Sequence, residues 1–207
     1  MGTPKALVTL RGKSFLAHLL EAAQHPKIGL VRVVLGSGDE EIRRALNLPA
    51  EIVVLNPDWQ RGQLSSIQAA VRALAADPIG AEALAEGALK EGALDADPIG
   101  SRALDGILLC PVDHPLVSRA LVAALIATFY SDAKPPIVVP TFRARRGHPV
   151  IFARSLFPEL LVAPQDEGAR AVVWAHAAEV AEVPTDEEGV VLNLNDPAAL
   201  LRAEDKS

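Results

Sequence analysis

Two short segments of the chain combine residue types that could act on a nucleoside triphosphate. Lys5 follows a glycine and a proline in the opening Met-Gly-Thr-Pro-Lys-Ala-Leu, and Asp113 follows the apolar run Leu108–Val112. A lysine after a glycine turn can reach phosphate oxygens, and an aspartate that ends a buried strand can bind the magnesium ion that accompanies them. Taken alone, Lys5 is more typical of a lysine in a surface turn. Asp113 could also cap the next helix, but we favour the metal role for it.

Further polar residues surround the start of a predicted helix at 62–74. Asn56 ends an apolar run, and Gly62, Ser65 and Ser66 stand where the helix begins. The free backbone N–H groups of a helix start can bind base, ribose or phosphate oxygens. A simple serine-capped helix start would give the same pattern.

The second half of the chain offers residues for an acceptor and for the metal ion. Arg146, Gly147 and His148 precede Pro149. The arginine could bind an acceptor phosphate bidentately, and the glycine permits close backbone approach, whereas a histidine beside a proline is also typical of a structural position. Asn195 could donate its carbonyl oxygen to a metal ion or cap the last helix.

These residues must be positioned by strands and helices that alternate along the chain. The hydrophobic periodicity predicts helices at 14–24, 39–46, 62–74, 118–130, 156–161, 168–177 and from 197, and strands at 29–36, 51–55, 106–110, 137–140, 148–153, 180–183 and 190–194. This order predicts an α/β fold: a doubly wound, mostly parallel sheet in a three-layer α/β/α arrangement, with the ligand at the carboxyl ends of the strands. Asn56 and Asp113 fall at such ends.

Residues 76–105 interrupt the alternation. The pentapeptide Ala-Asp-Pro-Ile-Gly occurs at 76–80 and again at 96–100, in a stretch rich in Ala, Glu and Gly. We expect a duplicated surface insertion without a catalytic role, because a long loop adds little closure entropy. The length of 207 residues fits a single domain that includes this insertion.

Composition excludes several classes of protein. The net charge is −6, whereas binding to nucleic acid or to a membrane surface needs a basic face. The single cysteine, Cys110, excludes an internal disulfide and fits a reducing compartment. No apolar run approaches the roughly 20 residues that span a bilayer. We therefore expect a cytoplasmic protein.

Six motifs in order resemble the MobA-like nucleotidyltransferases of molybdenum cofactor biosynthesis, and the resemblance runs nearly end to end. They are Met1-Gly2-Thr3-Pro4-Lys5-Ala6-Leu7, Asn56-Pro57-Asp58-Trp59 with Gly62 and Ser65-Ser66-Ile67, Pro111-Val112-Asp113, Gly147-His148-Pro149, Asp166-Glu167-Gly168-Ala169-Arg170, and Asn193-Leu194-Asn195. Asn193-Leu194-Asn195 is similar to the guanylyl-transferring branch, and the remainder to the cytidylyl-transferring branch and its relatives.

The resemblance implies a Rossmann-like fold of the nucleotide-diphospho-sugar transferase type. It implies Mg²⁺-dependent transfer of CMP or GMP from CTP or GTP to a phosphorylated acceptor, molybdopterin first of all, with release of pyrophosphate. A molybdoenzyme or its chaperone is the candidate protein partner. The implied roles are catalysis by Lys5 and Asp113, nucleotide binding by Gly2, Lys5, Asn56, Gly62, Ser65 and Ser66, acceptor binding by Arg146, Gly147, His148 and Arg170, and metal binding by Asp113 and Asn195. Asp166 and Arg170 could equally mark an exposed helix start and an internal ion pair.

In the resembled family, a short apolar strand and a glycine-rich loop stand directly before the Met-Gly-x-Pro-Lys motif. This sequence begins at the motif itself. We therefore expect a gap between buried strands whose backbone groups lack partners, and a start further upstream in a longer protein. A truncated, impaired relative is the alternative. The choice between cytosine and guanine also depends on that segment, so the nucleotide is left open.

Two other functions fit the same residues. A sugar phosphate or an alcohol phosphate could replace molybdopterin as the acceptor, because folds of this kind serve several acceptors. Alternatively, the chain is a catalytically silent nucleotide-binding or partner-binding domain whose insertion at 76–105 mediates contact. Magnesium-dependent binding of a triphosphate distinguishes the two, because the enzyme should show it and a silent partner-binding domain should not.

Overall fold

The computed structural model describes residues 3–76, 104–195 and 197–204. Its first part contains η1 (Lys5–Leu7), β1 (Thr9–Leu10), β2 (Lys13–Ser14), α1 (Phe15–Ala22), β3 (Val33–Leu35), α2 (Asp39–Ala45), η2 (Ala50–Ile52), β4 (Val53–Leu55), η3 (Trp59–Arg61) and α3 (Gln63–Ala76). Its second part contains β5 (Gly106–Leu109), α5 (Arg119–Phe129), β6 (Ile137–Phe142), β7 (Arg145–Arg146), β8 (Val150–Ala153), η4 (Arg154–Leu156), α6 (Phe157–Val162), α7 (Arg170–Ala175), η5 (Ala177–Glu179), β9 (Val180–Pro184), η6 (Glu188–Val190) and α8 (Pro197–Glu204).

Among the described residues, the strands of the α/β fold form a mixed main sheet, a separate parallel pair and the antiparallel β1–β2 hairpin. The main sheet has the order β5-β8-β6-β7, and β9 pairs with β6 in parallel. β8 runs antiparallel to both β5 and β6. β3 and β4 pair in parallel with each other, outside the main sheet.

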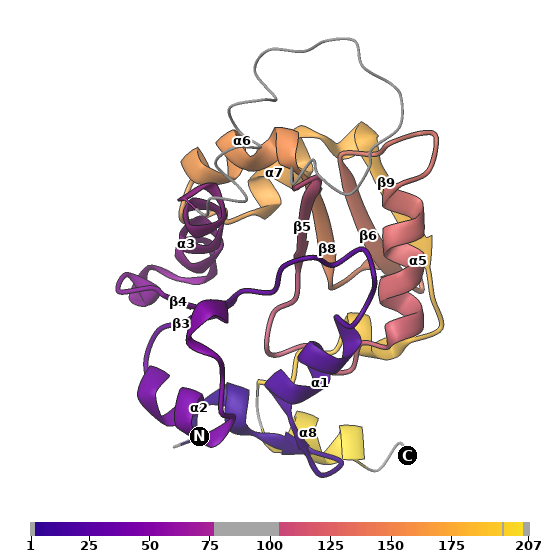
Figure 1. Cartoon of the computed structure of the whole chain (residues 1–207). Helices are drawn as coiled ribbons and strands as arrows, with labels where there is room; N and C mark the ends of the chain where they lie inside the picture. Colours follow the sequence, from indigo (N-terminus) through magenta and orange to yellow (C-terminus); the bar gives the residue numbers. More distant parts are fainter. Residues whose placement is uncertain (1–2, 77–103, 196, 205–207) are drawn as a thin grey trace.

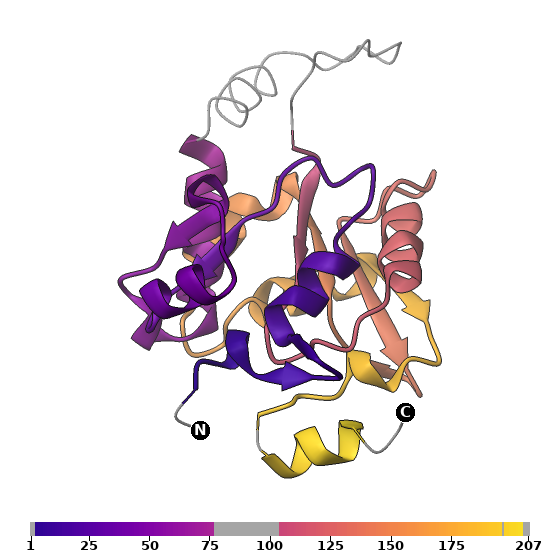
Figure 2. The same cartoon turned by 60° about the horizontal axis from the view of Figure 1, so that its bottom comes forward.

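Helices cover both faces of the main sheet, as the predicted three-layer arrangement requires (Figure 1). The alternation of β6 directs Val138 toward α1 and α5, and directs Ile137 and Val139 toward α3, α6 and α7. Figure 2 shows the same layers from a second direction, with α8 (yellow) at one end of the molecule. α6 and α7 lie at the opposite end (Figure 1).

Most predicted elements agree with the structure, and local capping explains several of their boundaries. The hydroxyl of Ser14 accepts a hydrogen bond from the N–H of Ala17 at the start of α1 (3.2 Å), as expected for an N-cap. The predicted strand at 29–36 is reduced to Val33–Leu35. The predicted insertion at 76–105 falls largely outside the described residues.

The predicted strand at 190–194 is wrong. Val190 ends η6, and the residues after it form an irregular segment. Its backbone pairs with two loops rather than with a strand. The N–H of His148 donates to the carbonyl of Val190 (2.8 Å), and the N–H of Leu194 donates to the carbonyl of Asp113 (2.8 Å). The apolar residues that suggested a strand are buried in two different clusters. Val190 and Val191 pack with residues of α1 and α5, whereas Leu194 packs with Leu10 and with α8.

No helix among the described residues is both long enough and apolar enough to cross a membrane.

Candidate active site

The predicted site is assembled from three segments at the end of the sheet where β5 finishes. Asp113 lies in the loop after β5, Lys5 lies in η1, and Asn193 and Asn195 lie between η6 and α8. These segments are 80 to 190 residues apart in sequence, and two side-chain hydrogen bonds join them.

The first of these bonds holds the Asp113 carboxylate. The side-chain amide of Asn193 donates from Nδ2 to Asp113 Oδ2 (2.8 Å). The backbone N–H of Leu194 donates to the Asp113 carbonyl (2.8 Å), and the Leu194 side chain is buried against Leu10 and Phe15. The carboxylate is thus oriented by a segment that is itself anchored in the core.

The second bond joins Lys5 to the same segment. The Lys5 ammonium donates from Nζ to Asn195 Oδ1, with both side chains exposed to solvent. Burial alternates along this segment, with Leu194 buried between the exposed Asn193 and Asn195, so the two asparagines lie on the same side of it and both face the site. The structure therefore connects Lys5 and Asp113 through the segment that contains Asn193 and Asn195. The sequence analysis assigned no role to Asn193, although the Asn-x-Asn spacing was the signal for it.

Two imidazoles lie beside Asp113, of which His114 is buried and His148 is half-buried. The rings of His114 and His148 are 4.7 Å apart between centroids, and neither Nδ1 has a hydrogen-bond partner among the described residues. Burial lowers the pKa of His114, opposed by the Asp113 charge. Burial, together with the neighbouring His114, lowers the pKa of His148 to about 4. Both rings are therefore neutral at neutral pH and add no positive charge to the site.

The predicted acceptor loop is held against η6. A Cβ added to Gly147 would lie 2.3 Å from the carbonyl oxygen of Val190, so only glycine permits this approach. Arg146 donates from Nε to Glu182 Oε1 of β9 (2.7 Å), and both side chains are exposed. Gly147 and His148 thus lie near Asp113, because the ring of His148 contacts the ring of His114, the residue after Asp113. Arg146 of β7 points away from them toward Glu182.

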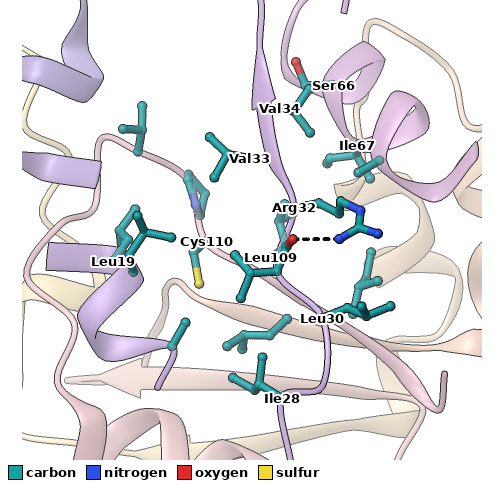
Figure 3. Close-up of a pocket in the computed structure, with 18 of the residues that line it drawn as sticks. Leu19, Ile28, Leu30, Arg32, Val33, Val34, Ser66, Ile67, Leu109 and Cys110 are labelled. Atoms are coloured by element: carbon teal, nitrogen blue, oxygen red, sulfur yellow. Dashed lines mark hydrogen bonds between the residues drawn. The ribbon is translucent and has the colours of Figure 1, made fainter. Parts of the chain in front are cut away.

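The residues around the start of α3 form a hydrogen-bonded turn. Asn56 is only 4% exposed and donates from Nδ2 to the hydroxyls of Ser65 (2.9 Å) and Ser66 (3.0 Å). Its Oδ1 accepts from the N–H of Asp58 (3.0 Å), and Gly62 has a φ of +98°. Asn56 and Ser65 therefore shape this turn, whereas Ser66 also lines a cavity of about 1050 Å³, seen in Figure 3.

Substitution of Asn56 by alanine is expected to lower the free energy of unfolding by about 2 kcal/mol, because buried donors and acceptors lose their partner. Urea unfolding followed by circular dichroism measures the change. Gln60→Ala is the control, since Gln60 is exposed in the adjacent η3. Equal stability of the two variants would show that the Asn56 hydrogen bonds do not stabilise the fold.

Arg170 and Gly2 are two further predicted site residues that no described contact joins to Lys5, Asp113 or Asn195. Arg170 begins α7, at the other end of the molecule from α8 (Figure 1). It donates from Nε to the Glu167 carbonyl (2.8 Å) and lies over the Trp174 ring. The structure thus gives Arg170 local partners, and acceptor binding by Arg170 stays a prediction without geometric support. Gly2 lies outside the described residues.

The donors at this site suit a hard divalent cation. Asp113 supplies a carboxylate and Asn195 a carbonyl oxygen, the ligand types that Mg²⁺ and Mn²⁺ accept together with water and phosphate. The contact with Asn193 uses Oδ2 of Asp113, and among the described residues no donor is bonded to Oδ1. The residues present therefore fit such an ion.

Comparisons with solved structures show the same fold. The chain is similar to Rv0371c from Mycobacterium tuberculosis H37Rv, with 26% identity and a TM-score of 0.72 over 99% of this chain and 90% of that one. A complex of Rv0371C with manganese matches at 24% identity and a TM-score of 0.67, over 99% and 93% of the two chains. Molybdopterin-guanine dinucleotide biosynthesis protein A from Archaeoglobus fulgidus matches at 19% identity and a TM-score of 0.59, over 99% and 91%.

Curated proteins offer no significant match. The model of the MobA-like NTP transferase domain, however, matches residues 1–180, which is most of the chain. This match agrees with the order of the motifs that lie within residues 1–180. The chain belongs to the MobA-like NTP transferase family.

Proposed function

We propose that this nucleotidyltransferase uses Mg²⁺ to transfer CMP or GMP from CTP or GTP to molybdopterin in the cytoplasm. The observation that carries the proposal is the cluster in which Asn193 orients Asp113 and Asn195 contacts Lys5. The cluster combines one ammonium group with one carboxylate at the carboxyl end of a buried strand, where α/β folds bind their ligands. The manganese complex of a relative supports a divalent cation.

In this proposal, each residue has a distinct task. The Lys5 ammonium binds the triphosphate, and Asp113 and Asn195 hold the cation through their oxygens. A bound Mg²⁺ would neutralise charge on the phosphate oxygens. An oxygen of the acceptor phosphate attacks the α-phosphorus, and the bond from that phosphorus to its β-phosphate bridging oxygen breaks, so pyrophosphate leaves with the electron pair. Because the attacking phosphate is already ionised, neutral His114 and His148 are not needed as bases.

The acceptor side of the proposal rests on the loop of Arg146, Gly147 and His148. Gly147 and His148 lie against the loop that contains Asp113, through the contacts of Val190 and His114. Arg146 pairs with Glu182 at the surface and would exchange this exposed, weakly held partner for an acceptor phosphate. Arg170 is left out of this acceptor site.

Acceptor profiling tests the proposal. The protein is incubated with Mg²⁺ or Mn²⁺, with CTP or GTP, and with molybdopterin, a sugar phosphate or an alcohol phosphate, and pyrophosphate release is measured. We expect release with molybdopterin and one of the two nucleotides. Pyrophosphate release only with a sugar phosphate or an alcohol phosphate would show that molybdopterin is not the acceptor. No release with any pair of nucleotide and acceptor would contradict the proposal that the chain is a nucleotidyltransferase.

Substitution of Lys5 by glutamine is expected to lower kcat/KM for the triphosphate about 30-fold, mainly through KM, because the triphosphate loses one cationic partner. Lys27→Gln is the matched control: Lys27 lies near the amino end of β5, where its ammonium contacts the Tyr130 ring. Steady-state kinetics at several triphosphate concentrations separates KM from kcat. Similar kcat/KM values for the two variants would show that Lys5 does not bind the triphosphate.

A further inference from the structure

The imidazole of His176 lies between two carboxylates that belong to different elements. Its Nδ1 is 2.8 Å from Glu179 Oε1 of η5, and its Nε2 is 2.9 Å from Glu159 Oε2 of α6. His176 itself directly follows α7. The ring therefore connects three elements at the end of the molecule opposite α8, far from the predicted active site (Figure 1).

The number of protons on the ring follows from its partners. An ionised carboxylate only accepts hydrogen bonds, and a neutral imidazole has a single N–H group. Because both ring nitrogens face carboxylate oxygens, only the imidazolium form of His176 can donate to Glu159 and Glu179 at the same time. A neutral ring would direct a nitrogen lone pair at one of the two carboxylates, and that contact would be lost.

α6 is a short helix whose stability depends on contacts with other elements. It has six residues, and its N-cap residue, Leu156, makes no side-chain hydrogen bond to it. A helix of this length does not form stably on its own. Phe157 and Leu160 bury its apolar face, and Gln68 of α3 donates from Nε2 to the Leu160 carbonyl (3.2 Å). The contact with His176 adds a charged partner to these.

We propose that protonated His176 is a pH-dependent clasp, which fixes α6 to η5 through Glu159 and Glu179 and loosens α6 when the ring loses one proton. The three side chains are 23%, 45% and 58% exposed for His176, Glu159 and Glu179. Solvent protons can therefore reach the ring, and water weakens each ion pair. The clasp thus acts on the local stability of α6 rather than on the whole fold.

The charges around the ring set the direction of the pH dependence. Hydrogen bonds to Glu179 and Glu159 raise the pKa of His176 above its usual value, partly opposed by burial. Arg170, the charged residue of α7, lies over the Trp174 ring instead. A raised pKa in the folded state stabilises that state at acidic pH. The clasp is therefore closed below the ordinary pKa of histidine and opens as the pH rises through the raised pKa.

An NMR titration of the His176 ring nitrogens tests the charge state. We expect protons on both nitrogens below the titration midpoint. The midpoint should shift downward in Glu159→Gln and in Glu179→Gln, because each variant loses one charged acceptor. Glu167→Gln is the matched control, since Glu167 is an exposed carboxylate just before α7. An unchanged midpoint in either of the two variants would overturn the proposal.

Hydrogen exchange then tests whether the clasp holds α6. In His176→Gln, we expect the amides of Leu161 and Val162 to exchange about fivefold faster than in the unmodified chain below the His176 midpoint, and equally fast above it. The two proteins are compared at the same pH, and neither measurement needs a nucleotide, so the result does not depend on the proposed function. Equal exchange at acidic pH would overturn the clasp. A difference that persisted at alkaline pH would also overturn it, because a purely structural role of His176 would not depend on its charge.

Discussion

Replacing Asp113 by asparagine is expected to reduce kcat/KM for nucleotidyl transfer about 10³-fold. Asparagine keeps the size of the side chain and an oxygen that can accept from Asn193 Nδ2, so the loop after β5 should keep its position. The negative charge that a divalent cation needs is lost. The defect should therefore appear in catalysis and metal binding, with an unchanged free energy of unfolding.

Three measurements isolate this effect. Pyrophosphate release gives kcat/KM, electron paramagnetic resonance gives the affinity for Mn²⁺, and urea unfolding gives stability. Asp132→Asn is the matched control, because Asp132 is exposed after α5, near the amino end of β5 rather than its carboxyl end. Activity of Asp113→Asn within about threefold of the control would exclude Asp113 as a metal ligand.

Substitution of Gly147 by alanine is expected to lower the free energy of unfolding by about 3 kcal/mol. The new Cβ would lie 2.3 Å from the Val190 carbonyl oxygen and 2.7 Å from its carbonyl carbon. These are backbone atoms, so rotation of a side chain cannot relieve the overlap. The N–H of His148 donates to the same carbonyl, and this hydrogen bond should weaken as the two segments separate.

The damage should extend to the active site, because Val190 leads directly to Asn193 and Asn195. We expect Gly147→Ala to lose activity even at temperatures where circular dichroism shows it folded. Gly29→Ala is the control, since a Cβ at Gly29 would contact no atom within 4 Å. Equal unfolding midpoints in urea for the two variants would show that the contact between Gly147 and Val190 adapts at little cost.

Local patterns in the sequence determined much of the fold. The hydrophobic period predicted α1, α3 and α5 and the strands β5 and β6, because burial of one face imposes spacing on the residues themselves. The hydroxyl of Ser14 caps the start of α1 through a bond within its own turn. The order of the motifs predicted the family, which the domain match confirms. Such features depend on neighbours within a few residues.

The tertiary structure alone decided which polar side chains meet. Sequence could place Lys5, Asp113 and Asn195 at the ends of elements, but their contacts join segments 80 to 190 residues apart. The sequence also did not predict the contact of His114 with His148 or the distant position of Arg170. Local sequence does not determine which distant loop packs against a given side chain. The strand predicted at 190–194 failed for the same reason: its apolar residues report burial, but the partner of the backbone decides whether a buried segment becomes a strand.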